Sequence, residues 1–162
     1  MTDLDTRVHL LLRASAHTVA TAESLTGGRL AVHFTTVPGS SETYLGGVVT
    51  YATEVKSSML DVPGELLDQH GVVSPEFARA MATGVRALTG ASFGVSTTGV
   101  AGPTDQEGKP PGTVYVGVSG PGILEAVELD LEGEREDIQE QTCDRALEVL
   151  AAILEAEETP LG

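Results

Sequence analysis

Three short polar segments carry the side chains in this sequence that could do chemistry. They are ESLTGG (23–28), TYATEVK (50–56) and STTGVAGP (96–103), and each follows a run rich in apolar residues. The first segment contributes Ser24 and the second Lys56. A lysine desolvated in an apolar crevice loses its proton more readily and can act as the base for a serine nucleophile. The two residues therefore predict nucleophilic catalysis without a metal, provided that folding brings Lys56 within hydrogen-bond reach of Ser24.

The residues after Ser24 predict a place for negative charge. Ser24 is expected where a strand meets a helix, so the N–H groups that follow it would lie at the positive end of the helix dipole. Such amides can hold a phosphate or stabilise an oxyanion. The amides in question belong to Thr26, Gly27 and Gly28.

Other common catalytic patterns are absent from the sequence. There is no HExxH, CxxC or acidic calcium loop, and the four histidines are scattered, so we expect neither a metal site nor a cofactor. A P-loop needs four residues between its first glycine and the GK pair, whereas five separate Gly102 from Gly108 here. The stretch GVSTTG has one residue too many for the GxSxG nucleophile elbow.

The charge balance limits the partners. The chain of 162 residues has 24 acidic and 9 basic residues and a net charge of −15, which argues against nucleic acid as a partner. An anionic ligand must instead be held by local amides and a few cations, for which Arg135 and Arg145 are candidates. The single cysteine excludes an internal disulfide and suits a reducing compartment. With no signal-peptide pattern and no apolar run long enough to span a bilayer, we expect a cytoplasmic protein with no membrane partner.

Taken singly, each candidate has a simpler structural explanation. A serine before a helix is commonly an N-cap, and a lysine is commonly solvated at the surface. Tyr51 could end a strand with its ring in the core, and Gly27 and Gly28 could merely permit tight helix packing. The catalytic interpretation therefore depends on the three segments acting together.

The elements that must position these segments alternate between helix and strand. Helices are predicted over 3–16, 27–37, 74–90 and about 134–158, and strands over 17–22, 44–52, 91–99, 112–120 and 123–131. The last two strands form an antiparallel hairpin through Gly120-Pro121-Gly122, and the continuous apolar run of 44–52 predicts a buried strand. The pattern indicates a single α/β domain over 1–162 with a mostly parallel sheet, frayed after residue 154. If the first three strands are parallel neighbours, the three polar segments meet in one crevice at their carboxyl ends.

Together, TAESLTGG, GGVVTYATEVK, GVVSPEFARAMA and STTGVAGP…GKPPGTVYVGV resemble the CinA C-terminal domain family, also known as the PncC or nicotinamide mononucleotide (NMN) deamidase family. The resemblance runs from about His17 to about Gly117 and continues in GERED. It implies a three-layer α/β/α domain that self-associates as a homo-oligomer. It also implies hydrolysis of the NMN carboxamide to nicotinic acid mononucleotide and ammonia, by a serine nucleophile with a lysine partner and no metal.

The family's roles transfer to particular residues of this chain. By this resemblance Ser24 is the nucleophile and Lys56 its base, while Tyr51 and Thr98 position the reacting groups. The substrate-binding residues expected around them are Glu23, Thr26, Gly27, Gly28, Gly99, Gly102, Arg135 and Arg145. Many relatives carry an additional N-terminal molybdopterin-binding-like domain, so the resemblance here is to the stand-alone form.

Three departures from the family pattern bear on the substrate. Leu25 stands where the family usually has cysteine, and TDQEG (104–108) stands where it often has two glycines, which adds the negative charges of Asp105 and Glu107. Gln139 replaces a basic residue that could contact a phosphate. A non-catalytic nucleotide-binding or interaction module, of the kind that gave CinA proteins their association with competence, is therefore the alternative function. A phosphotransferase is a third reading, which the missing P-loop disfavours.

Overall fold

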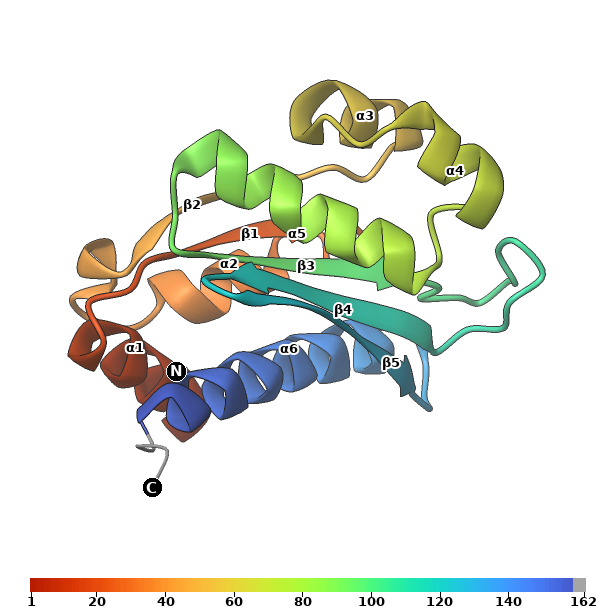
Figure 1. The fold of residues 1–162 in the computed structure, drawn as a ribbon. Helices are drawn as coiled ribbons and strands as arrows, with labels where there is room; N and C mark the ends of the chain where they lie inside the picture. The colour runs from red at the N-terminus through yellow and green to blue at the C-terminus, as the bar shows by residue number, and fades with distance from the viewer. Residues whose placement is uncertain (159–162) are drawn as a thin grey trace.

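A computed structural model describes residues 1–158 of the chain and shows a three-layer α/β/α domain built on one five-stranded mixed sheet (Figure 1). The predicted fold class is confirmed. The helices of the described residues are α1 (Asp3–Ala14), α2 (Arg29–Thr35), η1 (Ser40–Glu42, a 3-10 turn), α3 (Thr53–Leu60), α4 (Gly64–His70), α5 (Pro75–Thr89) and α6 (Arg135–Glu158). The strands are β1 (Val19–Glu23), β2 (Tyr44–Val49), β3 (Phe93–Gly99), β4 (Thr113–Gly120) and β5 (Ile123–Asp130).

The strand order places the three polar segments next to one another. The sheet runs β2-β1-β3-β4-β5, with β1 parallel to both of its neighbours and β4 antiparallel to both of its own. In register, Glu23 pairs with Val49 on one side and with Thr97 on the other. The chain therefore leaves these three strands at one edge of the sheet, as the sequence predicts, and the segments that carry Ser24 and Thr98 begin side by side there.

Helices cover both faces of the sheet. In Figure 1, α3, α4 and α5 lie on one side, while α1, α2 and α6 lie on the other. Two separate apolar clusters fill the interfaces, one centred on α6 and one on α5. Helix α5 approaches β3 and β4 closely because a side chain at Gly94 or Gly117 would lie 2.1–2.3 Å from a carbonyl oxygen of that helix.

Helix α5 begins as its sequence predicts. Ser74 is its N-cap and accepts a hydrogen bond from Phe77 N at 3.2 Å, Pro75 is its first residue, and Gly90 ends it in the left-handed conformation. The helix therefore has fixed ends, and the segment before it, which includes Val72, enters at a defined angle.

Three predictions about the elements need correction. Strand β2 lies at the sheet edge, and its residues alternate between half-buried and exposed, so it is not the buried strand that its apolar run suggested. No helix was predicted between residues 37 and 74, whereas α3 begins at Thr53, within the polar segment 50–56. Helix α6 continues to Glu158, so residues 155–158 are helical; the remainder of the predicted frayed tail, 159–162, lies outside the described residues.

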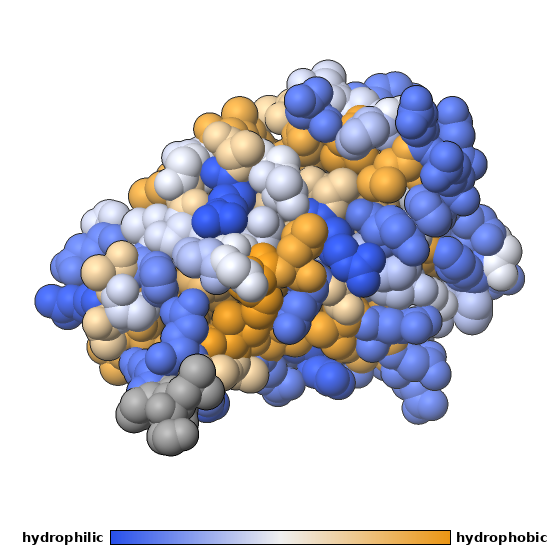
Figure 2. Space-filling model, viewed as in Figure 1, coloured by the Kyte–Doolittle hydropathy of each residue, from blue (hydrophilic) through white to orange (hydrophobic). Residues whose placement is uncertain are grey.

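Apolar side chains are also exposed on the surface. Figure 2 shows them gathered between the β4–β5 hairpin and α6, where a groove of about 610 Å³ is lined by residues such as Ile123, Val127 and Ile153. Within the described residues, no helix is both long and apolar enough to cross a bilayer.

Candidate active site

A cavity of about 330 Å³ lies at the carboxyl edge of β1, β2 and β3, where the three polar segments meet. Seven of the predicted site residues line it: Ser24, Tyr51, Lys56, Thr98, Gly99, Gly102 and Arg135. The other five do not: Glu23, Thr26, Gly27, Gly28 and Arg145. The fold thus brings the proposed nucleophile and base to one polar cavity, together with a guanidinium.

Ser24 begins the turn after β1 and presents a free hydroxyl. Its backbone N–H donates to Thr97 O at 3.1 Å, which ties the turn to β3. Its hydroxyl has no hydrogen-bond partner among the described residues, and the side chain is half-buried. The N-cap of α2 is Gly28, so Ser24 is not the helix cap that the simpler explanation requires.

Lys56 is buried, with 2% of its surface exposed. It shares a face of α3 with Leu60, four residues later, and its Nζ donates a hydrogen bond to Tyr51 O at 3.1 Å. Burial lowers the pKa of Lys56 from 10.5 to about 8, an effect that the negative charges of Glu54 and Glu107 partly offset. A substantial share of this amine is therefore neutral near pH 8, which a surface lysine would not be.

The predicted hydrogen bond between Ser24 and Lys56 is not formed in this structure. Within the described residues, no hydrogen bond joins Lys56 Nζ to Ser24 Oγ; the amine is bonded to Tyr51 O instead. The two side chains share the wall of one cavity. Catalytic hydrogen bonds commonly shorten only when substrate is bound, so the arrangement is compatible with a base that engages Ser24 in the complex.

Arg135, the first residue of α6, closes one side of the cavity. Its guanidinium donates to Tyr51 Oη at 2.7 Å and to Gly102 O at 2.5 Å. Tyr51 is 60% exposed, so its ring is not in the core, and its hydroxyl lies at the mouth with the arginine. Within the described residues this solvent-exposed guanidinium is held by a phenol and a carbonyl, and it can exchange these partners for a phosphate.

Thr98 and the two glycines of the third segment shape the cavity wall. The Thr98 hydroxyl donates to Val72 O at 2.6 Å and so holds the segment before α5 against β3. A side chain at Gly99 would lie 2.6 Å from Thr113 O, and one at Gly102 would lie 2.9 Å from Pro111. Both glycines are therefore required by contacts within the chain, and both line the cavity.

Glu23 has a structural role instead of the predicted contact with substrate. It is 1% exposed, and its carboxylate accepts hydrogen bonds from Leu30 N at 2.8 Å, Ala31 N at 3.1 Å and Gly28 N at 3.2 Å. The Thr26 hydroxyl donates to the same carboxylate at 2.7 Å. Glu23 therefore satisfies the amides at the start of α2 that would otherwise remain unpaired.

Two of the three amides expected to bind an oxyanion in the first turn have partners within the chain. Gly28 N is bonded to Glu23, and Gly27 N donates to Ser24 O at 3.1 Å. Thr26 is completely buried and also contacts the Thr97 hydroxyl at 2.8 Å. Leu25, by contrast, lines the cavity, and its N–H has no acceptor within the described part of the chain.

Arg145 lies outside the site. It is on the exposed side of α6 and pairs with Glu148, one helical turn further along, at 3.3 Å. Its predicted role in binding an anion is not supported by this placement.

Residues 1–154 match the family model described as the CinA C-terminal domain. The chain belongs to this family. Its CinA motifs are the segments that form the cavity, and the resemblance noted from the sequence is confirmed.

Curated relatives carry the same name over part of their length. The CinA-like protein of Citrifermentans bemidjiense is 43% identical over 161 residues, which cover 99% of this chain and 39% of that protein. The putative competence-damage inducible protein of Halalkalibacterium halodurans is 50% identical over 125 residues, which cover 76% of this chain and 30% of that protein. The chain thus spans between 30% and 39% of the length of these two relatives.

Solved structures share the fold over nearly the whole chain. A competence-damaged protein (CinA) superfamily protein from Klebsiella pneumoniae superposes with a TM-score of 0.92 at 34% identity, covering 95% of this chain and 97% of that one. The competence/damage-inducible protein CihA from Agrobacterium tumefaciens superposes with a TM-score of 0.89 at 34% identity, covering 93% of each chain. The CinA fold is therefore established here at the level of architecture.

Two supporting residues of this CinA domain were not identified as such from the sequence. Gln139, considered only as a lost phosphate contact, is buried, and its amide donates to the carbonyl oxygen of Leu25, next to Ser24, at 2.9 Å. Thr97 accepts from Ser24 N through its hydroxyl at 3.3 Å and faces away from the cavity. The pair of threonines in STTG is visible in the sequence, and the structure places Thr98, the one singled out by the resemblance, in the cavity wall.

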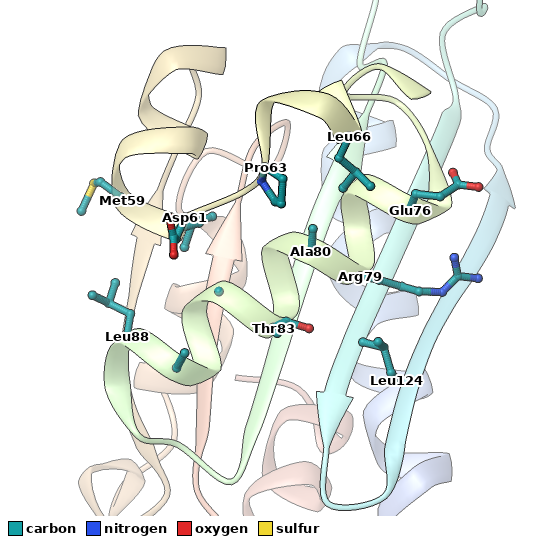
Figure 3. Close-up of a pocket in the computed structure, with 13 residues that line it drawn as sticks. Met59, Asp61, Pro63, Leu66, Glu76, Arg79, Ala80, Thr83, Leu88 and Leu124 are labelled. Atoms are coloured by element: carbon teal, nitrogen blue, oxygen red, sulfur yellow. The ribbon is translucent and has the colours of Figure 1, made fainter. Parts of the chain in front are cut away.

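A groove larger than this cavity lies away from this chemistry. It measures about 710 Å³ and runs along α5, beneath the end of α3 and beside the β4–β5 hairpin (Figure 3). Its lining is mostly apolar, with Met59, Leu88 and Leu124 exposed. Its larger size does not make the groove the better active-site candidate, because its lining has no serine, lysine or cysteine that could act as a nucleophile.

Among the described residues, no three histidine, cysteine or carboxylate side chains are grouped to hold a metal.

Proposed function

We propose that this CinA domain hydrolyses the carboxamide of NMN to nicotinic acid mononucleotide and ammonia, with Ser24 as nucleophile and Lys56 as base. The observation that carries the proposal is the buried amine of Lys56, with a pKa of about 8, in the same cavity as the unpartnered hydroxyl of Ser24. Burying a lysine is costly, and a site that needs a neutral amine accounts for it.

The hydrogen bond to Tyr51 O orients the base. A neutral amine has two N–H donors and one lone pair, so Lys56 can keep an N–H on the Tyr51 carbonyl while its lone pair accepts the Ser24 proton. Ser24 Oγ then attacks the amide carbon, and a tetrahedral oxyanion forms. The Lys56 ammonium returns the proton to the amide nitrogen, the C–N bond breaks, and ammonia leaves an ester on Ser24.

Water completes the cycle. Lys56, neutral again, takes a proton from a water molecule that attacks the ester, and the Ser24 oxygen recovers its proton as the acid leaves. The N–H of Leu25, adjacent to the nucleophile, is the donor we assign to the oxyanion. Leu25 lines the cavity and Thr26 does not, and the N–H groups of Gly27 and Gly28 are occupied. The guanidinium of Arg135 at the cavity mouth is the cation we assign to the phosphate.

No hydrogen bond joins Ser24 and Lys56 within the described residues. The alternative function is therefore a CinA domain that binds a nucleotide without turnover. Purified protein with NMN in the presence of EDTA separates the two functions. The amidohydrolase releases ammonia, and equimolar nicotinic acid mononucleotide accumulates. The binding module is stabilised against heat by NMN but releases no ammonia, and that result would overturn the proposed hydrolysis.

A further inference from the structure

The loop between β3 and β4 forms one wall of the cavity and is anchored at both ends. Near its start, Gly102 O accepts a hydrogen bond from Arg135. Near its end, Gln106 and Lys109 exchange backbone hydrogen bonds at 3.0 and 2.9 Å, and the Lys109 ammonium contacts Val73 O. The residues between these anchors, among them Asp105, are therefore held beside the cavity.

The two acidic residues of this loop have different surroundings. The Glu107 carboxylate accepts from Val73 N at 2.8 Å and from Val72 N at 3.1 Å, so it is committed to holding the loop against the segment before α5. Asp105 lines the cavity, and its carboxylate has no hydrogen bond or ion pair within the described residues. Only one of the two charges is thus available to a ligand.

Asp105 and Arg135 give the cavity charges of both signs. Among the described residues that line it, Asp105 is the sole carboxylate, and Arg135 is the cation that stays charged at any pH near neutrality. A cavity of this volume is on the order of 10 Å across, which is comparable with the Debye length of roughly 8 Å at physiological ionic strength. Both charges therefore interact with a bound molecule at any position within the cavity.

We propose that Asp105 is a specificity-determining residue that favours an amide on a positively charged, N-substituted pyridinium ring over the same amide on an uncharged ring. The proposal rests on the function proposed above and names the substrate class: a zwitterion, with its cationic ring complementary to Asp105 and its phosphate to Arg135. The reduced, dihydropyridine form of NMN has the same phosphate and amide but no ring charge, so it is the matched competitor.

The solvent exposure of Asp105 sets the size of the expected change in selectivity. Asp105 is exposed to solvent, and exposed charge pairs change an equilibrium by about two- to fivefold. Asp105→Asn is expected to lower the selectivity for NMN over reduced NMN by this factor. Binding and turnover of NMN should weaken, whereas those of reduced NMN should not change. The effect should shrink as salt is raised, because solvent-exposed charges are screened.

The test compares both forms of NMN as ligands and as substrates. Dissociation constants are measured by calorimetry with Ser24→Ala protein, which keeps the cavity but cannot form the ester, and kcat/KM is measured with Ser24 intact. Asp68→Asn, which removes an exposed carboxylate of α4 outside the cavity, is the matched control and should leave both ratios unchanged.

The outcomes separate this proposal from the proposed hydrolysis. If NMN binds more tightly than its reduced form and Asp105→Asn lowers that ratio, the specificity role is supported even in a protein that releases no ammonia. If Asp105→Asn changes both ligands equally, changes neither, or neither ligand binds, the specificity role is overturned whether or not NMN is hydrolysed.

Discussion

Lys56 Nζ lies 3.1 Å from the main-chain oxygen of Tyr51, five residues earlier, and donates a hydrogen bond to it. The contact spans the start of α3 and holds a nearly fully buried amine at the edge of a polar cavity. Burial lowers the pKa of Lys56 to about 8, and the carbonyl takes one of its N–H groups. The remaining lone pair makes the residue a base near neutral pH.

The pKa of Lys56 predicts the pH dependence of hydrolysis. The value of kcat/KM for NMN should rise about tenfold per pH unit below pH 8 and level off above it, as the amine loses its proton. The measurement is a pH profile of initial rates. Lys56→Arg, whose side chain stays protonated, should be inactive throughout; an active Lys56→Arg variant with the same profile would assign the titration to another group.

The same pKa predicts a pH-dependent stability. Because the folded pKa of about 8 lies below the unfolded value of 10.5, the unfolded chain binds more protons between these values, and the free energy of unfolding rises with pH there. The destabilisation is fully present below pH 8 and is on the order of 3 kcal/mol. Lys56→Met should thus be more stable than wild type at pH 7, with the gap narrowing by pH 10 in urea titrations. A gap of constant size would mean that Lys56 titrates normally.

Arg135 should matter only for substrates that carry a phosphate. Arg135→Gln is expected to raise KM for NMN about tenfold, since charged hydrogen bonds contribute roughly 1.5–3 kcal/mol, and to leave KM for nicotinamide riboside unchanged. Arg145→Gln is the control, because Arg145 pairs with Glu148 outside the cavity. Equal effects of Arg135→Gln on the nucleotide and the nucleoside would show that the arginine acts through the cavity shape instead.

Glu23 should be essential for stability. In Glu23→Gln an amide nitrogen must face N–H donors of α2, so we expect a loss of about 1–3 kcal/mol in the free energy of unfolding. Glu65→Gln, at an exposed position of α4, should cost almost nothing. If the two variants unfold alike, the amides at the start of α2 do not depend on Glu23.

Sequence patterns predicted an α/β domain with a mostly parallel sheet and, if its first three strands are parallel neighbours, the meeting of the three polar segments; the three layers were implied by the family resemblance. Local signals sufficed there: Ser74, Pro75 and Gly90 mark α5, and the strands end in hydroxyl- and glycine-rich turns. Helix α3 escaped prediction because its N-cap, Ala52, offers no side-chain oxygen and a lysine occupies one of its buried positions. The burial of this lysine thus explains both why the helix was not predicted and why the pKa of Lys56 is lowered.

The supporting contacts of the site could not be predicted because they join residues far apart in sequence. Gln139 reaches Leu25 across 114 positions, and Glu107 reaches Val73 across 34. The role of Glu23 could not be separated from substrate binding either, since a carboxylate beside a helix start suits both. Its burial and its hydrogen bonds to α2 decide between them.

The most direct test of the central claim is the initial rate of ammonia release from NMN at pH 8 for wild type, Ser24→Ala and Lys56→Met, with EDTA present. Removing a nucleophile or its base from a site of this kind lowers kcat by at least about a thousandfold. Both variants should lose that much activity while remaining folded, and Ser58→Ala, at an exposed serine of α3, should keep the wild-type rate. A folded Ser24→Ala protein that releases ammonia within tenfold of wild type would contradict the account.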